Sequence, residues 1–120
     1  LMSSWKTNYL SWLKSPYPRI IIKYEDLHNN TFVNFKKILF FISKFMKIEI
    51  NENKIYKIIE KCSFDNLKHE EENFGFSEKV GNDNFFRKGL VDEWKSKLSS
   101  NSIKLIEDKF KKEMIELNYL

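Results

Sequence analysis

The chain has 120 residues, 42% of them hydrophobic and 32% charged, with 21 lysines and arginines against 17 acidic residues. This length fits one domain that can bury more than about 60% of its unfolded surface, and the composition excludes a disordered tail. The net charge of +4 suits a polyanionic ligand but identifies none. A single cysteine excludes a disulfide within the chain and favours a cytoplasmic location. The apolar runs are too short for a membrane segment.

A strand is predicted before the first long helix. Residues 20–22 are three consecutive isoleucines, preceded by Pro16 and Pro18. An unbroken apolar run is typical of a strand that is buried on both faces of a parallel sheet. We therefore expect a parallel core strand at about residues 19–24, with Tyr24 at the carboxyl edge where open α/β sheets bind ligands. Its partner strands are not visible in this sequence.

The middle of the chain is predicted to be helical. Asn30 or Thr31 can cap one helix and Asn51 a second, and residues 63–72 can continue as a short helical piece. Residues 68–72 form a charged face of that piece. The apolar stripe of the first helix is Phe32, Phe35, Ile38, Leu39, Ile42, Phe45 and Met46. The inward positions of the second are Ile55, Ile58, Ile59 and Cys62.

Residues 73–89 are predicted to form a long loop, because they contain all three glycines and no sustained period. Residues 90–94 are predicted to open a helix immediately after it. A last helix, capped by Ser99, Ser100 or Ser102, is expected to pack on the sheet. Its apolar face consists of Ile103, Ile106, Phe110, Met114 and Leu117.

The end of this loop, NFFRKG at residues 84–89, combines several groups that bind phosphate. Arg87 is one of only two arginines, and its planar guanidinium can make two parallel hydrogen bonds to a phosphate, which lysine cannot. Gly89 lets the backbone approach a ligand, and the first N–H groups of a helix at residues 90–94 would face the same anion. The pattern predicts a phosphate-binding corner. The alternative is a solvated basic pair in a loop.

Four segments, in order, resemble the sulfotransferase family, whose members transfer a sulfuryl group from 3′-phosphoadenosine 5′-phosphosulfate (PAPS) to a hydroxyl or amine. Trp5 and Trp12 resemble a tryptophan-bearing helix, and RIIIKYEDL at residues 19–27 resembles the core strand that follows it. SFDNL at residues 63–67 resembles the segment near the adenine. FFRKG, with Trp94 and Lys95, resembles the family's FxRKGxxGDWK block.

The resemblance implies a clamp for the 3′-phosphate of the nucleotide. Arg87, Lys88 and the backbone of Gly89 match the residues that form this clamp in the family. Asp92 departs from the pattern, because it stands at the glycine position of the GDW triplet.

The resemblance also implies contacts on the adenine side. Phe64 and Phe85 match positions that flank the base, where an aromatic face can stack, and Tyr24 matches a tyrosine on the same side. Cys62 stands where vertebrate members often have a threonine. Ordinary core packing is the competing interpretation for these aromatic residues.

The residues that act on the sulfuryl group lie in the N-terminal half of the family's domain, which this chain does not match. His28 and His69 match no catalytic position, so we assign no catalytic residue, and the spacing of His and Cys predicts no metal site. We therefore expect residues 1–120 to be the C-terminal part of a sulfotransferase domain of the three-layer, P-loop α/β type, mostly helical with one parallel core strand. Its expected partners are the nucleotide, an unidentified acceptor and the missing N-terminal half.

Two other functions stay open. The chain could be a noncatalytic remnant of a sulfotransferase, or a small basic helical protein that binds nucleic acid. The second is disfavoured, because the aromatic residues fall on apolar helical stripes rather than on one basic face. The family's dimer segment has no match after Lys95, so dimerisation by that route is not predicted.

Overall fold

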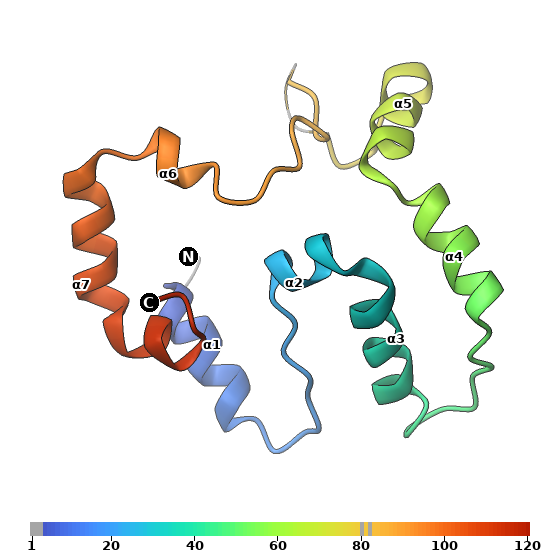
Figure 1. Cartoon of the computed structure of the whole chain (residues 1–120), viewed down its shortest axis with the longest axis horizontal. Coiled ribbons are helices and arrows are strands. Elements are labelled where there is room, and N and C mark those ends of the chain that lie inside the picture. The colour runs from blue at the N-terminus through green and yellow to red at the C-terminus, as the bar shows by residue number, and fades with distance from the viewer. Residues whose placement is uncertain (1–3, 80, 82) are drawn as a thin grey trace. The chain divides into compact units, whose positions relative to one another are not determined.

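Seven helices follow one another in the computed structural model, which describes residues 4–79, 81 and 83–120 (Figure 1). No strand is formed by the residues described. The chain divides into two units, one made of Leu1–Arg19 together with Asp92–Leu120 and the other of Ile20–Val91. The prediction of a mostly helical chain is therefore confirmed.

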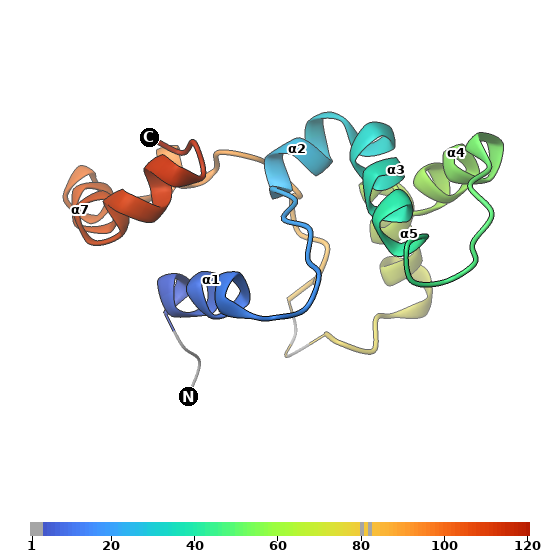
Figure 2. The same ribbon diagram turned by 90° about the horizontal axis from the view of Figure 1, so that it is seen from below.

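The unit of residues 20–91 contains four helices that pack in chain order. They are α2 (Tyr24–Asn29), α3 (Thr31–Ile42), α4 (Glu52–Lys61) and α5 (Phe64–Phe74). Helix α2 contacts α3, α3 contacts α4 and α4 contacts α5, as Figure 2 shows for the same four helices. Ile55 of α4 is enclosed between them at 2% exposure. The ring of Tyr56 stacks on that of Phe32, with 4.3 Å between centroids, and joins α4 to α3.

Polar side chains begin two of these helices, and the cap at Asn51 was predicted. The side chain of Asn51 accepts a hydrogen bond from the N–H of Lys54 at 3.1 Å and starts α4. The hydroxyl of Ser63 accepts one from the N–H of Asn66 at 3.4 Å and starts α5. Each bond satisfies an N–H that has no partner inside its helix.

Helix α3 begins differently from the prediction. Asn30 occupies the capping position, but its side chain makes no capping hydrogen bond. The buried side chain of Asn34 instead donates to the carbonyl oxygens of Asp26 and Asn30, at 2.7 and 3.0 Å. These bonds tie α3 to the end of α2, because a buried amide needs partners for its N–H groups.

The predicted core strand is not confirmed. Residues 19–23 form neither helix nor strand, and Tyr24 is the first residue of α2. A strand exists only through hydrogen bonds to a neighbouring strand, and the described residues provide none. Ile20 and Ile21 stay 38% and 49% exposed, so the apolar run is present without a sheet around it. The structure likewise does not confirm the three-layer α/β fold.

The other unit is built from α1 (Trp5–Lys14), α6 (Trp94–Lys97) and α7 (Ser100–Glu116). Ser99, one of the three predicted caps, accepts a hydrogen bond from the N–H of Ser102 and starts α7. Helix α1 packs on α7 through Trp5, whose ring meets Phe110 edge to face with 5.5 Å between centroids. Helix α7 therefore packs on a helix, and the described residues form no sheet beneath it.

The prediction that a helix begins at residues 90–94 is wrong. Helix α6 begins only at Trp94 and has four residues. Asp92 has a φ of 63°, in the left-handed region, which a right-handed helix cannot include. The prediction that helical N–H groups of residues 90–94 would face an anion at Arg87 therefore fails with it.

Two predicted apolar stripes also extend beyond their helices. Helix α3 ends at Ile42, and the following Phe45 and Met46 are 59% and 58% exposed. Cys62 lies at the C-terminal cap of α4 and is exposed rather than facing inward. No helix in the described part of the chain is long and apolar enough to span a membrane.

Candidate functional site

The loop that carries the predicted phosphate-binding residues is attached to α5 by one carboxylate. Glu71 lies in α5 and is only 5% exposed. The N–H of Phe85 donates to its Oε1 at 2.7 Å, and the N–H of Phe86 donates to its Oε2 at 2.9 Å. Two consecutive peptide groups are thereby fixed directly before Arg87 by hydrogen bonds to a charged acceptor, which are the stronger kind.

The surroundings of Glu71 favour its ionised form. Burial raises the pKa of the Glu71 carboxyl, but the N–H donors of Phe85 and Phe86 and then the charge of Lys79 lower it further than burial raises it. The net result is a pKa below the ordinary value. The carboxylate is therefore charged at neutral pH and accepts both hydrogen bonds.

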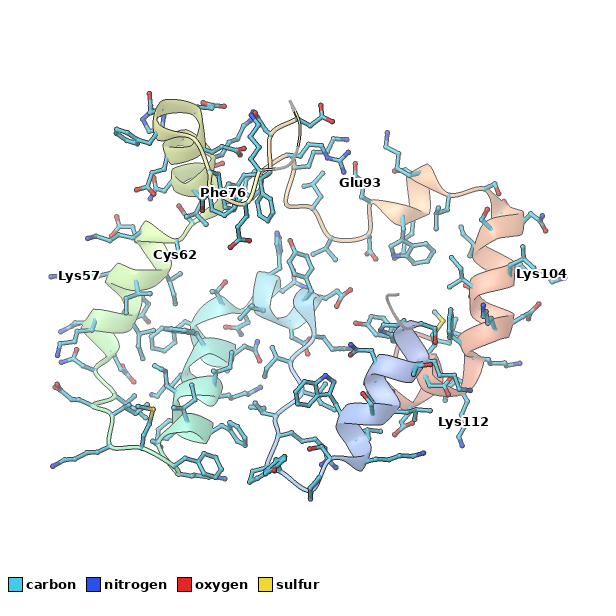
Figure 3. All side chains as sticks on the ribbon, turned by 180° about the vertical axis from the view of Figure 1, so that it is seen from behind. Lys57, Cys62, Phe76, Glu93, Lys104 and Lys112 are labelled. Carbon is cyan, nitrogen blue, oxygen red and sulfur yellow. The ribbon has the colours of Figure 1, made fainter. Side chains whose placement is uncertain are left out.

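Four phenylalanine rings pack beside this carboxylate and form the phenylalanine cluster: Phe64, Phe76, Phe85 and Phe86. The Phe76 ring lies 4.7 Å from Phe85 and 5.1 Å from Phe86 between centroids, and Phe64 meets Phe86 edge to face at 6.3 Å. Figure 3 shows Phe76 among the side chains between α5 and the loop. Aromatic pairs of this geometry add about 0.5–1.5 kcal/mol each beyond their burial. The cluster holds the loop on α5 from the apolar side.

Gly89 packs directly against this cluster. Its φ is 60°, and a Cβ at this position would lie 2.4 Å from Cδ2 and 2.6 Å from Cε2 of Phe64. No side chain fits there unless the ring moves. Glycine is therefore required both for the backbone conformation and for the close approach to Phe64.

The two cationic side chains of the loop face solvent. Arg87 and Lys88 are both exposed, and the N–H of Arg87 donates to the carbonyl oxygen of Phe85 at 3.0 Å in a tight turn. Among the residues described, no carboxylate forms an ion pair with the Arg87 guanidinium. An anion from solution can therefore reach this guanidinium.

Five of the seven predicted binding residues lie on or against the anchored loop. They are Phe64, Phe85, Arg87, Lys88 and Gly89. Cys62 stands at the end of α4, two residues before Phe64, where Figure 3 shows it beside the start of α5. Tyr24 is 54% exposed in α2, and its ring neighbour is His28, 6.0 Å away between centroids. Among the described residues, no ring contact links Tyr24 to the phenylalanine cluster.

Sequence reasoning missed Glu71 and Phe76, and it assigned no role to Phe86, which lies within the FFRKG motif. It placed Glu71 on a charged helical face, but Phe64, Leu67, Lys68 and Glu71 follow the i, i+3, i+4, i+7 spacing of one face. All four side chains are buried or half-buried. A carboxylate at the last position of this stripe was the signal that could have identified Glu71 as a buried acceptor.

Comparisons with known proteins establish the family. Residues 1–118 match the family model described as "Sulfotransferase domain". The chain therefore belongs to the sulfotransferase family, which confirms the resemblance to that family.

Curated plant proteins are similar to most of the chain. "Cytosolic sulfotransferase 10" of Arabidopsis thaliana is 32% identical over 82% of this chain and 32% of its own length. "Flavonol 4′-sulfotransferase" of Flaveria chlorifolia is 31% identical over 91% of this chain and 36% of its own. The chain thus spans about a third of the length of these relatives. No solved structure matches the chain. These findings do not favour a nucleic-acid-binding protein or a remnant.

Proposed function

We propose that this chain forms the part of a PAPS-dependent sulfotransferase site that holds the 3′-phosphate and adenine of the donor. The observation that carries the proposal is the loop of residues 85–89. It presents an exposed Arg87 guanidinium directly after two peptide groups that Glu71 fixes to α5. A binding loop fixed in advance loses less conformational entropy when a ligand arrives.

Three neighbouring groups would bind the 3′-phosphate. Arg87 would make two parallel hydrogen bonds to it, Lys88 would add a positive charge, and the backbone N–H of Gly89 would donate a further hydrogen bond. Charge-assisted hydrogen bonds of this kind contribute about 1.5–3 kcal/mol each.

The adenine side would use aromatic residues near the same loop. Phe85 is 53% exposed although its backbone N–H is tethered, so its ring can stack on a base. Phe64 is half-buried under Gly89 and would flank the base or support the loop. Tyr24 and Cys62 are assigned to this side by the resemblance alone.

The complete reaction would be transfer of the sulfuryl group from PAPS to an acceptor hydroxyl or amine. We assign the phosphosulfate loop and the catalytic residues to the N-terminal half of such a domain, of which residues 1–120 would be the C-terminal part. In the complete three-layer α/β domain, residues 19–23 would become the core strand, and the exposure of Ile20 and Ile21 supports this. Alone, the chain should bind nucleotide weakly and catalyse no transfer. A cytoplasmic location stays a prediction.

Calorimetric titration of the chain with adenosine 3′,5′-bisphosphate tests the proposal. AMP, which lacks the 3′-phosphate, is the control ligand. Arg19→Ala is the control variant, because it removes the other arginine, which lies outside the loop. We expect the bisphosphate to bind more tightly than AMP, and Arg87→Ala to weaken only the bisphosphate, by about 10-fold or more if one charge-assisted bond is lost. Equal binding of both ligands, or equal losses in both variants, would contradict the proposal.

A further inference from the structure

We propose that Glu71 is a positioning residue of the nucleotide site, which sets the direction in which Arg87 and Lys88 leave the backbone. The proposal rests on the function proposed above and extends it to a residue on a different element. It starts from geometry, since Glu71 lies in α5, fourteen residues before the first peptide group that it fixes.

The two hydrogen bonds act on the right part of the loop. They hold the N–H groups of Phe85 and Phe86, so the two peptide planes that flank Phe85 are fixed from one side. The Arg87 N–H is held in turn by the carbonyl oxygen of Phe85 at 3.0 Å. Productive contacts to a ligand tolerate errors of only about 0.5 Å, so a fixed backbone is needed at this position.

The chemistry requires a carboxylate rather than any polar group. Two N–H donors meet two acceptor oxygens, and Lys79 contributes a positive charge nearby. A glutamine has the same shape but offers one oxygen, and its NH₂ group would face the second N–H donor. A residue that only filled space would tolerate this exchange, whereas a residue that anchors two N–H groups would not.

A second polar contact restricts the movement of the loop just before Phe85. The ammonium of Lys79 donates to the side-chain oxygen of Asn84 at 3.2 Å, immediately before the two anchored peptides. The loop is thus attached to α5 in two ways. Glu71 holds it by polar contacts, and the phenylalanine cluster holds it by apolar contacts. We expect loss of the Glu71 contacts to release the loop without unfolding α5, so the release can be measured separately from global stability.

The test uses Glu71→Gln, with Glu72→Gln as its matched control. Both variants remove one negative charge from α5, but Glu72 is exposed. The spectroscopic readout is the amide proton shifts of Phe85 and Phe86 between pH 7 and pH 3. In the unmodified chain both shifts should follow one titration, with a midpoint below the ordinary carboxyl range. Glu71→Gln should abolish that titration, and Glu72→Gln should preserve it.

The functional readout is affinity for adenosine 3′,5′-bisphosphate and AMP. We expect Glu71→Gln to weaken bisphosphate binding about 5- to 30-fold, which corresponds to re-fixing one residue of backbone on binding, and to weaken AMP binding less, while the helical content stays unchanged. Glu71→Asp keeps the charge but has a shorter side chain, so its affinity for the bisphosphate should lie between those of the unmodified chain and Glu71→Gln. If Glu71→Gln does not fold, the pH titration of the unmodified chain and Glu71→Asp still decide the question.

The outcomes separate the two proposals. If the unmodified chain binds bisphosphate through Arg87 and Glu71→Gln binds it equally well, the positioning role is wrong and the proposed function stands. Amide shifts of Phe85 and Phe86 that do not respond to protonation of Glu71 would also overturn it. If bisphosphate binding does not require the 3′-phosphate at all, the proposed function fails, and with it any role of Glu71 in a nucleotide site.

Discussion

Replacing Gly89 by alanine should release the loop from α5. The penalty has two parts, because Gly89 has a φ of 60° and its missing Cβ would lie 2.4 Å from Cδ2 of Phe64. The left-handed conformation costs an alanine about 1–2 kcal/mol. Overpacking against the ring adds about 1–3 kcal/mol. The total is about 2–5 kcal/mol, unless Phe64 moves and disturbs the phenylalanine cluster instead.

The chain contains a matched control for the first part of this penalty. Gly81 lies in the same loop with a φ of 78°, and a Cβ there would meet nothing within 4 Å. Gly81→Ala therefore carries the conformational cost alone. The difference between the two variants isolates the contact with Phe64, and Phe64→Ala should abolish that difference, because it removes the ring atoms that the Cβ would meet.

Hydrogen exchange at the amides of Phe85 and Phe86 measures this difference, because both N–H groups are protected only while Glu71 holds the loop. We expect Gly89→Ala to exchange faster than Gly81→Ala, by roughly 5- to 150-fold for a contact penalty of about 1–3 kcal/mol. Equal exchange in the two variants would show that Gly89 does not pack on Phe64 as described. The loop would then be held in another way.

Two further predictions concern the unit that contains α1 and α7. The Lys6 ammonium lies 2.8 Å from Oε1 of Glu113, whose side chain is buried, and its hydrogen bond is the main reason that the pKa of Glu113 is lowered. This ion pair stabilises the folded chain at pH values above the ordinary carboxyl pKa, and its contribution is lost as the pH falls through the pKa of Glu113 in the folded chain. Lys6→Met should therefore lower the midpoint of thermal unfolding strongly at pH 7 and little at pH 3. An equal loss at both pH values would contradict an ionic role. Asp92 has a φ of 63°, so Asp92→Gly should be more stable than Asp92→Ala by about 1 kcal/mol in urea unfolding. The exposed ion pair from Asp92 to Lys95 is lost in both variants, so equal stability would mean that the left-handed conformation is not adopted in solution.

The local signals of the sequence predicted the structure well. Asn51 and Ser99 were named as capping candidates and both start helices, because a capping side chain needs only an N–H three residues later. The long loop after α5 also follows from glycine content and the missing period. Gly89 was predicted as a point where the backbone approaches a ligand, and the structure shows it in close approach to the Phe64 ring instead.

Features that depend on distant partners could not be predicted. The isoleucine run at residues 20–22 has the pattern of a buried strand, but a strand needs neighbours, and the described residues supply none. Asp92 breaks the helix expected at residues 90–94, because its φ lies in the left-handed region. Glu71 was missed because a buried carboxylate looks like a solvated one until its N–H partners, fourteen and fifteen residues away, are known.

A nuclear magnetic resonance titration of the isotope-labelled chain tests most directly whether this loop holds a 3′-phosphate. Adenosine 3′,5′-bisphosphate should shift the amide signals of residues 85–89 progressively, whereas AMP at the same concentration should leave the signals of residues 87–89 in place. If the bisphosphate shifts amides elsewhere in the chain, or if AMP shifts residues 87–89 equally, the loop is not a clamp for the 3′-phosphate.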